Sequence, residues 1–291
     1  MKKILLIVLS LSFFSCSSNL VTPSTRLETR EPANFQTCLE SMTNLMAYRP
    51  YYGEAAETFS KAKTFVGLEK LYGSDSLIDI QLNLSAEEIK KNNENIIKLA
   101  NAPFKVRTKK GKISALNDAD TNIIYQAMEG SEVNKNHWCY DTKGTIGFCF
   151  GRATIAHMEA IVRNINPESV KKIWIAGNMK QWGHHVATMV NTEKGWMVLD
   201  TNIGHPVTVE FWLNYYKPFK AKEAKEVMAF VTQAGRFGPY DTRAYNAIDL
   251  FNTESADFKK AEDYFNGYFH DYFESLDNIQ NKTLKKDEEA K

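Results

Sequence analysis

Three side chains in this sequence have the chemistry needed for cysteine-dependent acyl transfer. Cys149 begins an apolar helical stretch after a glycine-flanked turn. A thiol at a helix start lies among unpaired backbone N–H groups at the positive end of the helix dipole, which favours the thiolate. A thiolate attacks a carbonyl carbon when a histidine accepts and returns protons and a carboxylate orients that histidine. His185 and Asp200, each at the end of an apolar segment, are the candidates for these two roles.

The element that carries Cys149 is expected to be a central helix. Two apolar stripes run along it, one of Ile155, Met158, Val162 and Ile165 and the other of Phe150, Ala153, Ala156 and Ala160. Two stripes indicate burial on most sides. The helix should end at residues 164–166, because Pro167 disfavours helical geometry in the residue before it. The N–H of Cys149 is a natural oxyanion donor, and the sequence identifies no second one.

A predicted β-hairpin brings the other two residues together. Strands are expected at residues 172–176, 185–190 and 196–200, with a turn between the last two. If Val190 pairs with Gly195 across a four-residue loop, His185 lies directly opposite Asp200 on one face of the sheet. Opposed Cβ atoms are about 4.5–5.5 Å apart, which allows a hydrogen bond. A shift of one residue would place the two side chains on opposite faces.

Neighbouring polar residues have plainer interpretations. His184 is the nearest competitor for the base, but it points to the opposite face of the strand from His185. His157 is expected on a helix face and His205 in a loop. Arg152 is interpreted as an ion-pair residue on the helix as readily as a catalytic one. For the cysteine itself, packing and disulfide formation are the alternatives to catalysis.

The composition is that of an ordinary globular protein of one or two domains. The 291 residues are 43% hydrophobic and 24% charged. The 36 Lys and Arg residues balance 35 acidic residues, so no nucleic-acid-binding surface is expected. Neither a zinc-type CxxC pair nor an HExxH motif occurs, so we expect no metal and no cofactor. The oligomeric state is not predicted.

The N-terminus has the pattern of an export signal. Two lysines precede an apolar run, residues 4–14, which is too short to span a membrane as a stable helix. We interpret residues 1–15 as a signal peptide, Cys16 as a lipidated cysteine and residues 16–33 as a flexible tether. The lipid would anchor the exported protein to a membrane, as an outer-membrane lipoprotein facing the periplasm or the cell surface. Ordinary signal cleavage without a lipid is the alternative.

Three cysteines remain after Cys16. An exported chain meets oxidising conditions, in which two thiols tend to pair and the third is left over. A disulfide between Cys38 and Cys139 would leave Cys149 free, although the spacing alone does not decide the pairing.

Helical patterns dominate both ends of the chain. We predict a mainly helical N-terminal region, residues 34–115, in which residues 85–88 have the pattern of a capping box. A second region, residues 116–280, holds the three candidate residues and ends in an aromatic-rich helix at residues 255–278. Residues 281–291 are charged and predicted to be disordered. Helices combined with an antiparallel hairpin indicate the α+β class.

Five segments carry motifs that occur together in one known family. They are residues 149–153 (CFGRA), 172–180 (KIWIAGNMK), 182–190 (WGHHVATMV), 198–201 (VLDT) and 206–212 (PVTVEFW). In this order and with these gaps they resemble bacterial protein-glutaminases, over residues 117–252. The resemblance implies a papain- and transglutaminase-like core in which a central Cys-bearing helix packs on an antiparallel sheet, with extra N- and C-terminal helices. It also implies a catalytic domain at residues 116–280.

The resemblance assigns roles residue by residue. Cys149 falls on the nucleophile, His185 on the base and Asp200 on the orienting acid of a Cys-His-Asp triad. The implied activity is deamidation of glutamine side chains in a protein or peptide substrate, through a Cys149 thioester and with release of ammonia. Members of the family carry a removable pro-segment, so residues 34–115 are interpreted as a pro-segment that inhibits the cleft, an accessory domain or an extra layer.

Other functions fit the same residues. The thioester would make a transglutaminase if a lysine amine attacked it, and attack on a backbone amide would make a peptidase. A non-catalytic surface lipoprotein that keeps the fold for binding is the alternative outside enzymes. It predicts a thiol that is indifferent to iodoacetamide near neutral pH.

Overall fold

The computed structural model describes residues 59–72, 75–102, 111–135, 148–180, 182–240, 243–264, 275–282 and 285. All of them belong to one unit of the chain, Pro32–Lys291. The predicted signal peptide and tether, with the lipidation residue Cys16, lie outside the described residues, as do the predicted disulfide partners Cys38 and Cys139. None of the described helices is long and apolar enough to cross a membrane.

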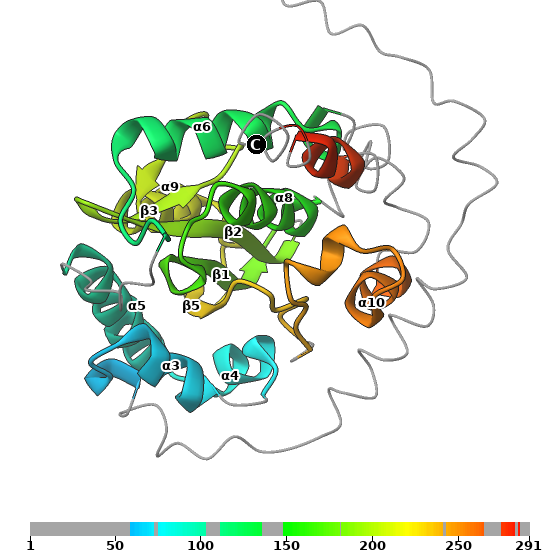
Figure 1. Ribbon diagram of the computed structural model, residues 1–291. Helices are drawn as coiled ribbons and strands as arrows, with labels where there is room; N and C mark the ends of the chain where they lie inside the picture. Colours follow the sequence, from blue (N-terminus) through cyan, green and yellow to red (C-terminus); the bar gives the residue numbers. More distant parts are fainter. Residues whose placement is uncertain are drawn as a thin grey trace, which may run out of the picture. The chain divides into compact units, whose positions relative to one another are not determined.

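A five-stranded sheet lies at the centre of the fold (Figure 1). Its strands follow the order β4-β3-β2-β1-β5, and every neighbouring pair is antiparallel. The strands are β1 (Val170–Met179), β2 (Trp182–Thr192), β3 (Gly195–Leu199), β4 (Val207–Thr208) and β5 (Met228–Gln233). Helices combined with this antiparallel sheet confirm the predicted α+β class.

Helices cover both faces of the sheet. They are α3 (Phe65–Tyr72), α4 (Leu77–Asn83), α5 (Ala86–Asn101), α6 (Asp118–Glu129), α8 (Cys149–Val162), α9 (Val209–Tyr216) and α10 (Ala256–Tyr264). Two consecutive residues of β1 show the two sides, because successive side chains of a strand point in opposite directions. Lys171 forms an ion pair of 2.7 Å with Glu69 of α3, whereas the Lys172 amine lies over the Phe150 ring of α8. Helices α3 and α8 therefore lie on opposite faces (Figure 1).

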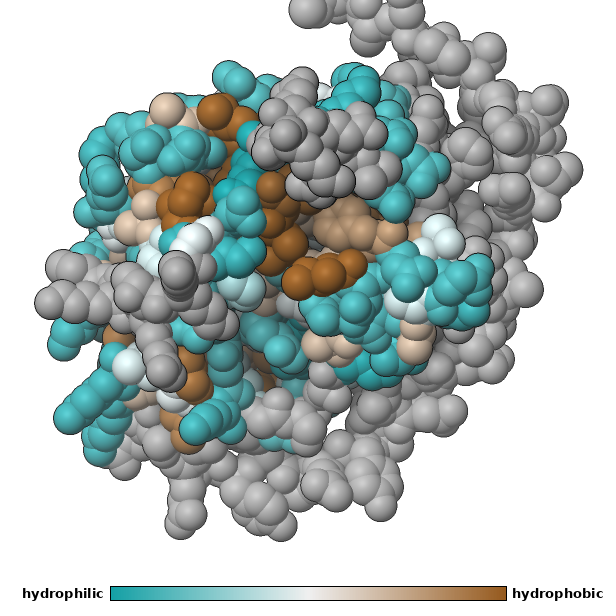
Figure 2. Space-filling model, in the orientation of Figure 1, coloured by the Kyte–Doolittle hydropathy of each residue, from teal (hydrophilic) through white to brown (hydrophobic). Residues whose placement is uncertain are grey.

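Helix α8 is enclosed on nearly all sides, as its two apolar stripes predict. Every residue from Gly151 to Ala160 is buried. Small side chains on the inner stripe let the helix approach β2 closely, and the Thr188 hydroxyl of β2 donates a 2.7 Å hydrogen bond to the Ala153 carbonyl. On the face seen in Figure 2, hydrophobic side chains gather near the middle, around the region of α8 and α10, within a largely hydrophilic surface. The hydrogen bond at Ala153 thus ties the N-terminal half of α8 to β2.

The N-terminal helices belong to the same hydrophobic core as the sheet. The Phe65 ring of α3 packs edge-on against Trp196 of β3, with 5.5 Å between centroids. Helix α5 begins with the predicted capping box at Ser85 and lies along the outer edge of β5, where the Asn92 amide donates to the Ala229 carbonyl at 2.8 Å. An edge strand needs such cover, because its unpaired backbone groups otherwise recruit other chains. This packing favours an extra layer as the interpretation of the N-terminal region.

The β2–β3 register differs from the predicted one. The connecting loop has two residues, because Thr192 pairs with Gly195 and Thr188 pairs with Leu199. The predicted pair of Val190 with Gly195 is therefore wrong by two positions. A shift of two preserves the face on which a side chain lies, so His185 and Asp200 still share a face. Gly195 is required here, since its φ is +105° and an added Cβ would lie 2.7 Å from the Ala100 carbonyl oxygen.

The packing of α3 predicts a large difference between two neighbouring substitutions. Phe65→Ala should lower the free energy of unfolding by about 3–5 kcal/mol, because Phe65 is 2% exposed and its removal leaves a cavity against Trp196. Val66→Ala, at a position 45% exposed, should change the free energy of unfolding by less than about 0.5 kcal/mol. Urea unfolding followed by circular dichroism measures both. Equal, small effects would show that α3 is a detachable segment rather than a layer of the core.

Candidate active site

Cys149 is the first residue of α8 and is a free thiol. The chain enters the helix through Phe148, which has a left-handed backbone with φ of +41° and offers no side-chain cap. The N–H groups of the first turn are therefore left without a capping side chain. The thiol is 7% exposed, so it lies just beneath the surface.

The sulfur lies beside a part of β2 with which β3 does not pair. β3 pairs with β2 only from Thr188 to Thr192, so among the described strands nothing pairs with β2 on that side at Val186. The N–H of Val186 instead hydrogen-bonds the Cys149 sulfur. The short β3 thus makes room for the thiol beside a free backbone donor.

The His185 imidazole lies between the thiol and the carboxylate. Its Nε2 is 2.7 Å from Oδ2 of Asp200, and the ring is also hydrogen-bonded to Cys149. Since Nε2 faces the carboxylate, Nδ1 is the nitrogen left for the sulfur. The ring also packs nearly parallel to Trp182 and Trp212, at 6.3 and 5.9 Å between centroids. The structure therefore brings the three sequence-predicted residues into one hydrogen-bonded chain.

Asp200 is buried and accepts a hydrogen bond from every side. Its Oδ2 accepts from Nε1 of Trp212 at 2.7 Å and from the Tyr216 hydroxyl at 2.8 Å, besides the bond to His185. Its Oδ1 accepts the Asn202 N–H at 3.1 Å. The side-chain amide of Asn202 also donates to the Tyr216 hydroxyl at 3.1 Å. A buried carboxylate with this many donors is held both in position and in its charged form.

Helix α9 supplies two of these donors, and the sequence reasoning did not find them. Trp212 and Tyr216 are four residues apart, so both point inward from the same face of α9. Thr208 caps the helix by accepting the Phe211 N–H at 3.2 Å. Trp212 lies in the last of the five family-like segments, but that match carries no role. The available signal was a pair of hydrogen-bonding aromatic residues one helical turn apart, shortly after a candidate carboxylate.

The pKa shifts favour an ion pair between thiolate and imidazolium. Burial alone would raise the pKa of the Cys149 thiol, but the His185 hydrogen bond and charge, the Arg152 charge and the Val186 N–H together lower it below its usual value. Burial would lower the pKa of His185, yet the Asp200 carboxylate raises it to about 9. Burial would raise the pKa of Asp200, and the His185 charge and the donors around it lower it strongly. His185 and Asp200 are therefore charged at neutral pH, and the Cys149 thiol is shifted toward the thiolate.

Arg152 contributes charge rather than a hydrogen bond. It is 4% exposed, and its Nη1 has no hydrogen-bond partner among the described residues. Its positive charge lowers the pKa of both Cys149 and Asp200. A buried cation one helical turn from the thiol therefore favours the charged form of both groups.

The other three histidines that the structure describes lie apart from this chain of hydrogen bonds. His184 points away from His185, and burial, with the nearby charge of His185, lowers the pKa of His184 to about 4. His157 on α8 hydrogen-bonds the Tyr245 hydroxyl at 3.3 Å, and burial lowers the pKa of His157 to about 3. His205 is exposed beside Phe211. These neutral or exposed imidazoles leave His185 as the base candidate.

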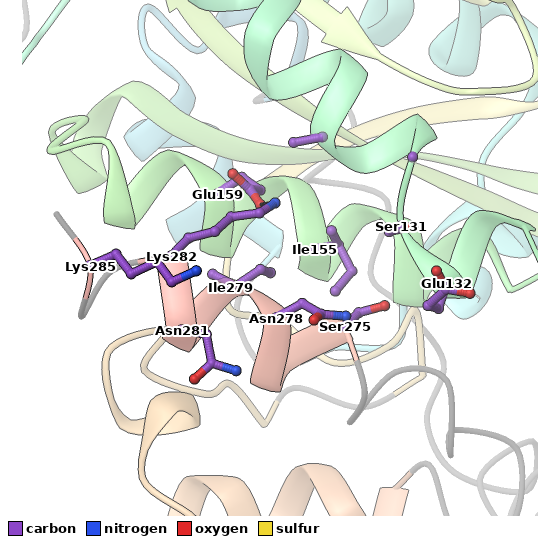
Figure 3. Close-up of a pocket in the computed structure, with 12 residues that line it drawn as sticks. Ser131, Glu132, Ile155, Glu159, Ser275, Asn278, Ile279, Asn281, Lys282 and Lys285 are labelled. Atoms are coloured by element: carbon purple, nitrogen blue, oxygen red, sulfur yellow. Dashed lines mark ion pairs between the residues drawn. The ribbon is translucent and has the colours of Figure 1, made fainter.

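A large cavity lies elsewhere, between α8 and the helical segment at residues 275–282 (Figure 3). It has a volume of about 590 Å³. Glu159 projects into it and pairs with Lys282 at 3.5 Å. Ten residues of helix separate Glu159 from Cys149, which is about 15 Å at 1.5 Å per residue. This cavity is therefore not the site of the thiol.

Among the described residues, no group of three or more His, Cys, Asp or Glu side chains could hold a metal ion.

The charge state of the thiol predicts its reactivity. Iodoacetamide should alkylate Cys149 faster at pH 7 than an ordinary thiol, because its lowered pKa raises the thiolate fraction. His185→Gln removes the imidazolium and leaves burial to raise the thiol pKa, so alkylation at pH 7 should slow roughly tenfold or more. His184→Gln, next to it in the chain but facing away, should leave the rate unchanged. Mass spectrometry of the peptide that contains Cys149 measures the rates. Identical pH profiles for all three proteins would refute the ion pair.

Comparisons with known proteins give a weak likeness. No family model matches the chain, and no curated protein matches it. The crystal structure of pro-protein-glutaminase aligns at 16% identity with a TM-score of 0.35, covering 60% of this chain and 67% of that one. A mutant form of pro-protein-glutaminase aligns at 19% identity with a TM-score of 0.36, covering 54% and 61%. The NMR structure of protein-glutaminase from Chryseobacterium proteolyticum aligns at 17% identity with a TM-score of 0.33, covering 51% and 89%. Such scores support a distant relationship at most.

Proposed function

We propose that this protein is a cysteine-dependent amidohydrolase that deamidates glutamine side chains of proteins. The observation that carries the proposal is the buried, hydrogen-bonded chain from Cys149 through His185 to Asp200. What supports glutamine as the substrate is the resemblance of five sequence segments, residues 149–153, 172–180, 182–190, 198–201 and 206–212, to protein-glutaminases.

The first half of the reaction forms a thioester. The Cys149 thiolate attacks the γ-carboxamide carbon, and the carbonyl oxygen takes the negative charge beside the uncapped start of α8, where the Cys149 N–H can donate. The His185 imidazolium then gives its proton to the amide nitrogen. The carbon–nitrogen bond breaks and ammonia leaves.

The second half releases glutamate. Neutral His185 takes a proton from a water molecule, whose oxygen attacks the thioester carbon. The carbon–sulfur bond breaks, and the sulfur leaves as the thiolate that the raised pKa of His185 again stabilises. Asp200 stays ionised throughout, because its donors hold its pKa far below neutrality. Its role is to orient the imidazole and to stabilise the imidazolium.

A direct assay separates the proposed reaction from its alternatives. The mature protein should release ammonia from an unfolded glutamine-containing protein and convert glutamine to glutamate, without new amino termini and without cross-links. Cys149→Ser and His185→Gln should each lower kcat by roughly 10⁶-fold, as in a nucleophile–base pair that acts as a unit. Coupled ammonia detection and peptide mass spectrometry provide the readout. New amino termini would identify a peptidase, incorporation of a lysine amine would identify a transglutaminase, and inertness toward all three would support a non-catalytic protein.

We also propose that the protein is exported and anchored by a lipid on Cys16. The support is sequence alone: a basic start, a short apolar run and a cysteine after Phe13-Phe14-Ser15. In a bacterial host, labelled palmitate should enter the wild-type chain and not the Cys16→Ser variant, and the wild type should fractionate with membranes. Label in neither protein, with the mature chain beginning elsewhere, would favour ordinary signal cleavage.

A further inference from the structure

Helix α9 carries aromatic side chains on two neighbouring faces, one buried and one partly exposed. Trp212 and Tyr216 point inward to Asp200, as described above. Phe211 and Tyr215, also four residues apart, point outward and are 49% and 38% exposed. The inward pair and the Thr208 cap already anchor this short helix. The Tyr215 hydroxyl donates to the Asn202 carbonyl at 3.3 Å and its ring lies 5.0 Å from Tyr216, yet both outward rings keep more than a third of their surface exposed.

Aromatic rings connect the outward face of α9 to the candidate active site. The Trp182 ring stacks on His185 on one side, at 6.3 Å between centroids, and is 6.2 Å from the nearly parallel Phe219 ring. Phe219 in turn lies 5.9 Å from Tyr215. Trp182 and Phe219 are only partly buried. We call Trp182, Phe211, Tyr215 and Phe219 the aromatic strip; it begins at the imidazole and ends on exposed surface.

We infer that the aromatic strip binds an apolar side chain of the substrate polypeptide close to the target glutamine. This inference rests on the proposed function and names the kind of substrate. A glutamine that reaches Cys149 brings its own backbone past His185, where the strip begins. An extended chain advances about 3.3 Å per residue, so the rings from Trp182 to Tyr215 lie within reach of residues about two to four positions away.

The occupant is a polypeptide because the exposed ring of Tyr215 lies 5.0 Å from Tyr216, whose ring is 4.6 Å from His185, so a residue that flanks the target glutamine can reach it. The rings of the aromatic strip offer apolar faces, which suit leucine, methionine or phenylalanine better than a charged side chain. Exposed aromatic surface next to a reacting centre is also the typical composition of a recognition site in proteins.

Matched peptides test the inference. Two series of acetylated peptides would carry one glutamine and differ only in having leucine or serine at a position two to four residues away, on either side. For at least one position, wild-type protein should release ammonia from the leucine peptide with kcat/KM about tenfold above the serine peptide. In the Phe211→Ser, Tyr215→Ser double variant this ratio should fall to near one. Ile123→Ser, at an exposed apolar position 42% exposed on α6, is the control and should keep both the ratio and the activity.

The outcomes separate this inference from the proposed function. Ammonia release with the same leucine-to-serine ratio in the wild type and in the folded double variant would overturn the inference and leave the proposed function intact. A leucine-to-serine ratio of kcat/KM near one in the wild type at every position would also overturn the inference and leave the proposed function intact. Absence of ammonia from all peptides and from unfolded protein would overturn the proposed function, and the inference with it. Thermal melting of each variant confirms that it is folded.

Discussion

The candidate site depends on keeping one carboxylate charged in the protein interior. Asp200 is 3% exposed, and burying a charge without partners costs several kcal/mol. The protein offsets this cost with donors from three places: the imidazole on β2, two rings on α9 and the backbone just after Asp200. Because those donors come from different elements, the buried charge of Asp200 is fully stabilised only when β2, the end of β3 and α9 are all assembled. The electrostatics of the thiol are therefore a property of the whole fold rather than of a motif.

The sheet positions the reacting groups from its two sides. Cys149 begins a helix that packs on one face, while alternation along β1 and β2 places His185 on the face shared with Lys171 and α3. The sulfur meets the imidazole at an edge, beside the N–H of Val186. The N-terminal helices bury the second face against Trp196 and β5, so they stabilise the strand that holds the imidazole.

The sequence predicted which helices and strands form the site better than it predicted how the two hairpin strands pair. The cysteine at a helix start, the central helix and the capping box at Ser85 follow from local patterns and are present. The hairpin loop was predicted two residues too long, since the turn-like residues 191–194 also fit strand ends, and only the contact of Gly195 with α5 reveals the shorter turn. Trp212 and Tyr216 could not be assigned, because an aromatic pair on a helix has the same pattern whether it packs or donates hydrogen bonds.

The length of β3 has a consequence for how this fold tolerates change. The strand ends at Leu199, and the backbone position that a longer strand would occupy beside Val186 is taken by sulfur. An insertion that continued the ladder by two more pairs, to Val186, would satisfy the same N–H with a carbonyl and strengthen the sheet. It would also displace the Cys149 sulfur from the Val186 N–H, its only backbone donor among the described contacts. A longer β3 and the Cys149 thiolate would therefore need the same donor, the N–H of Val186.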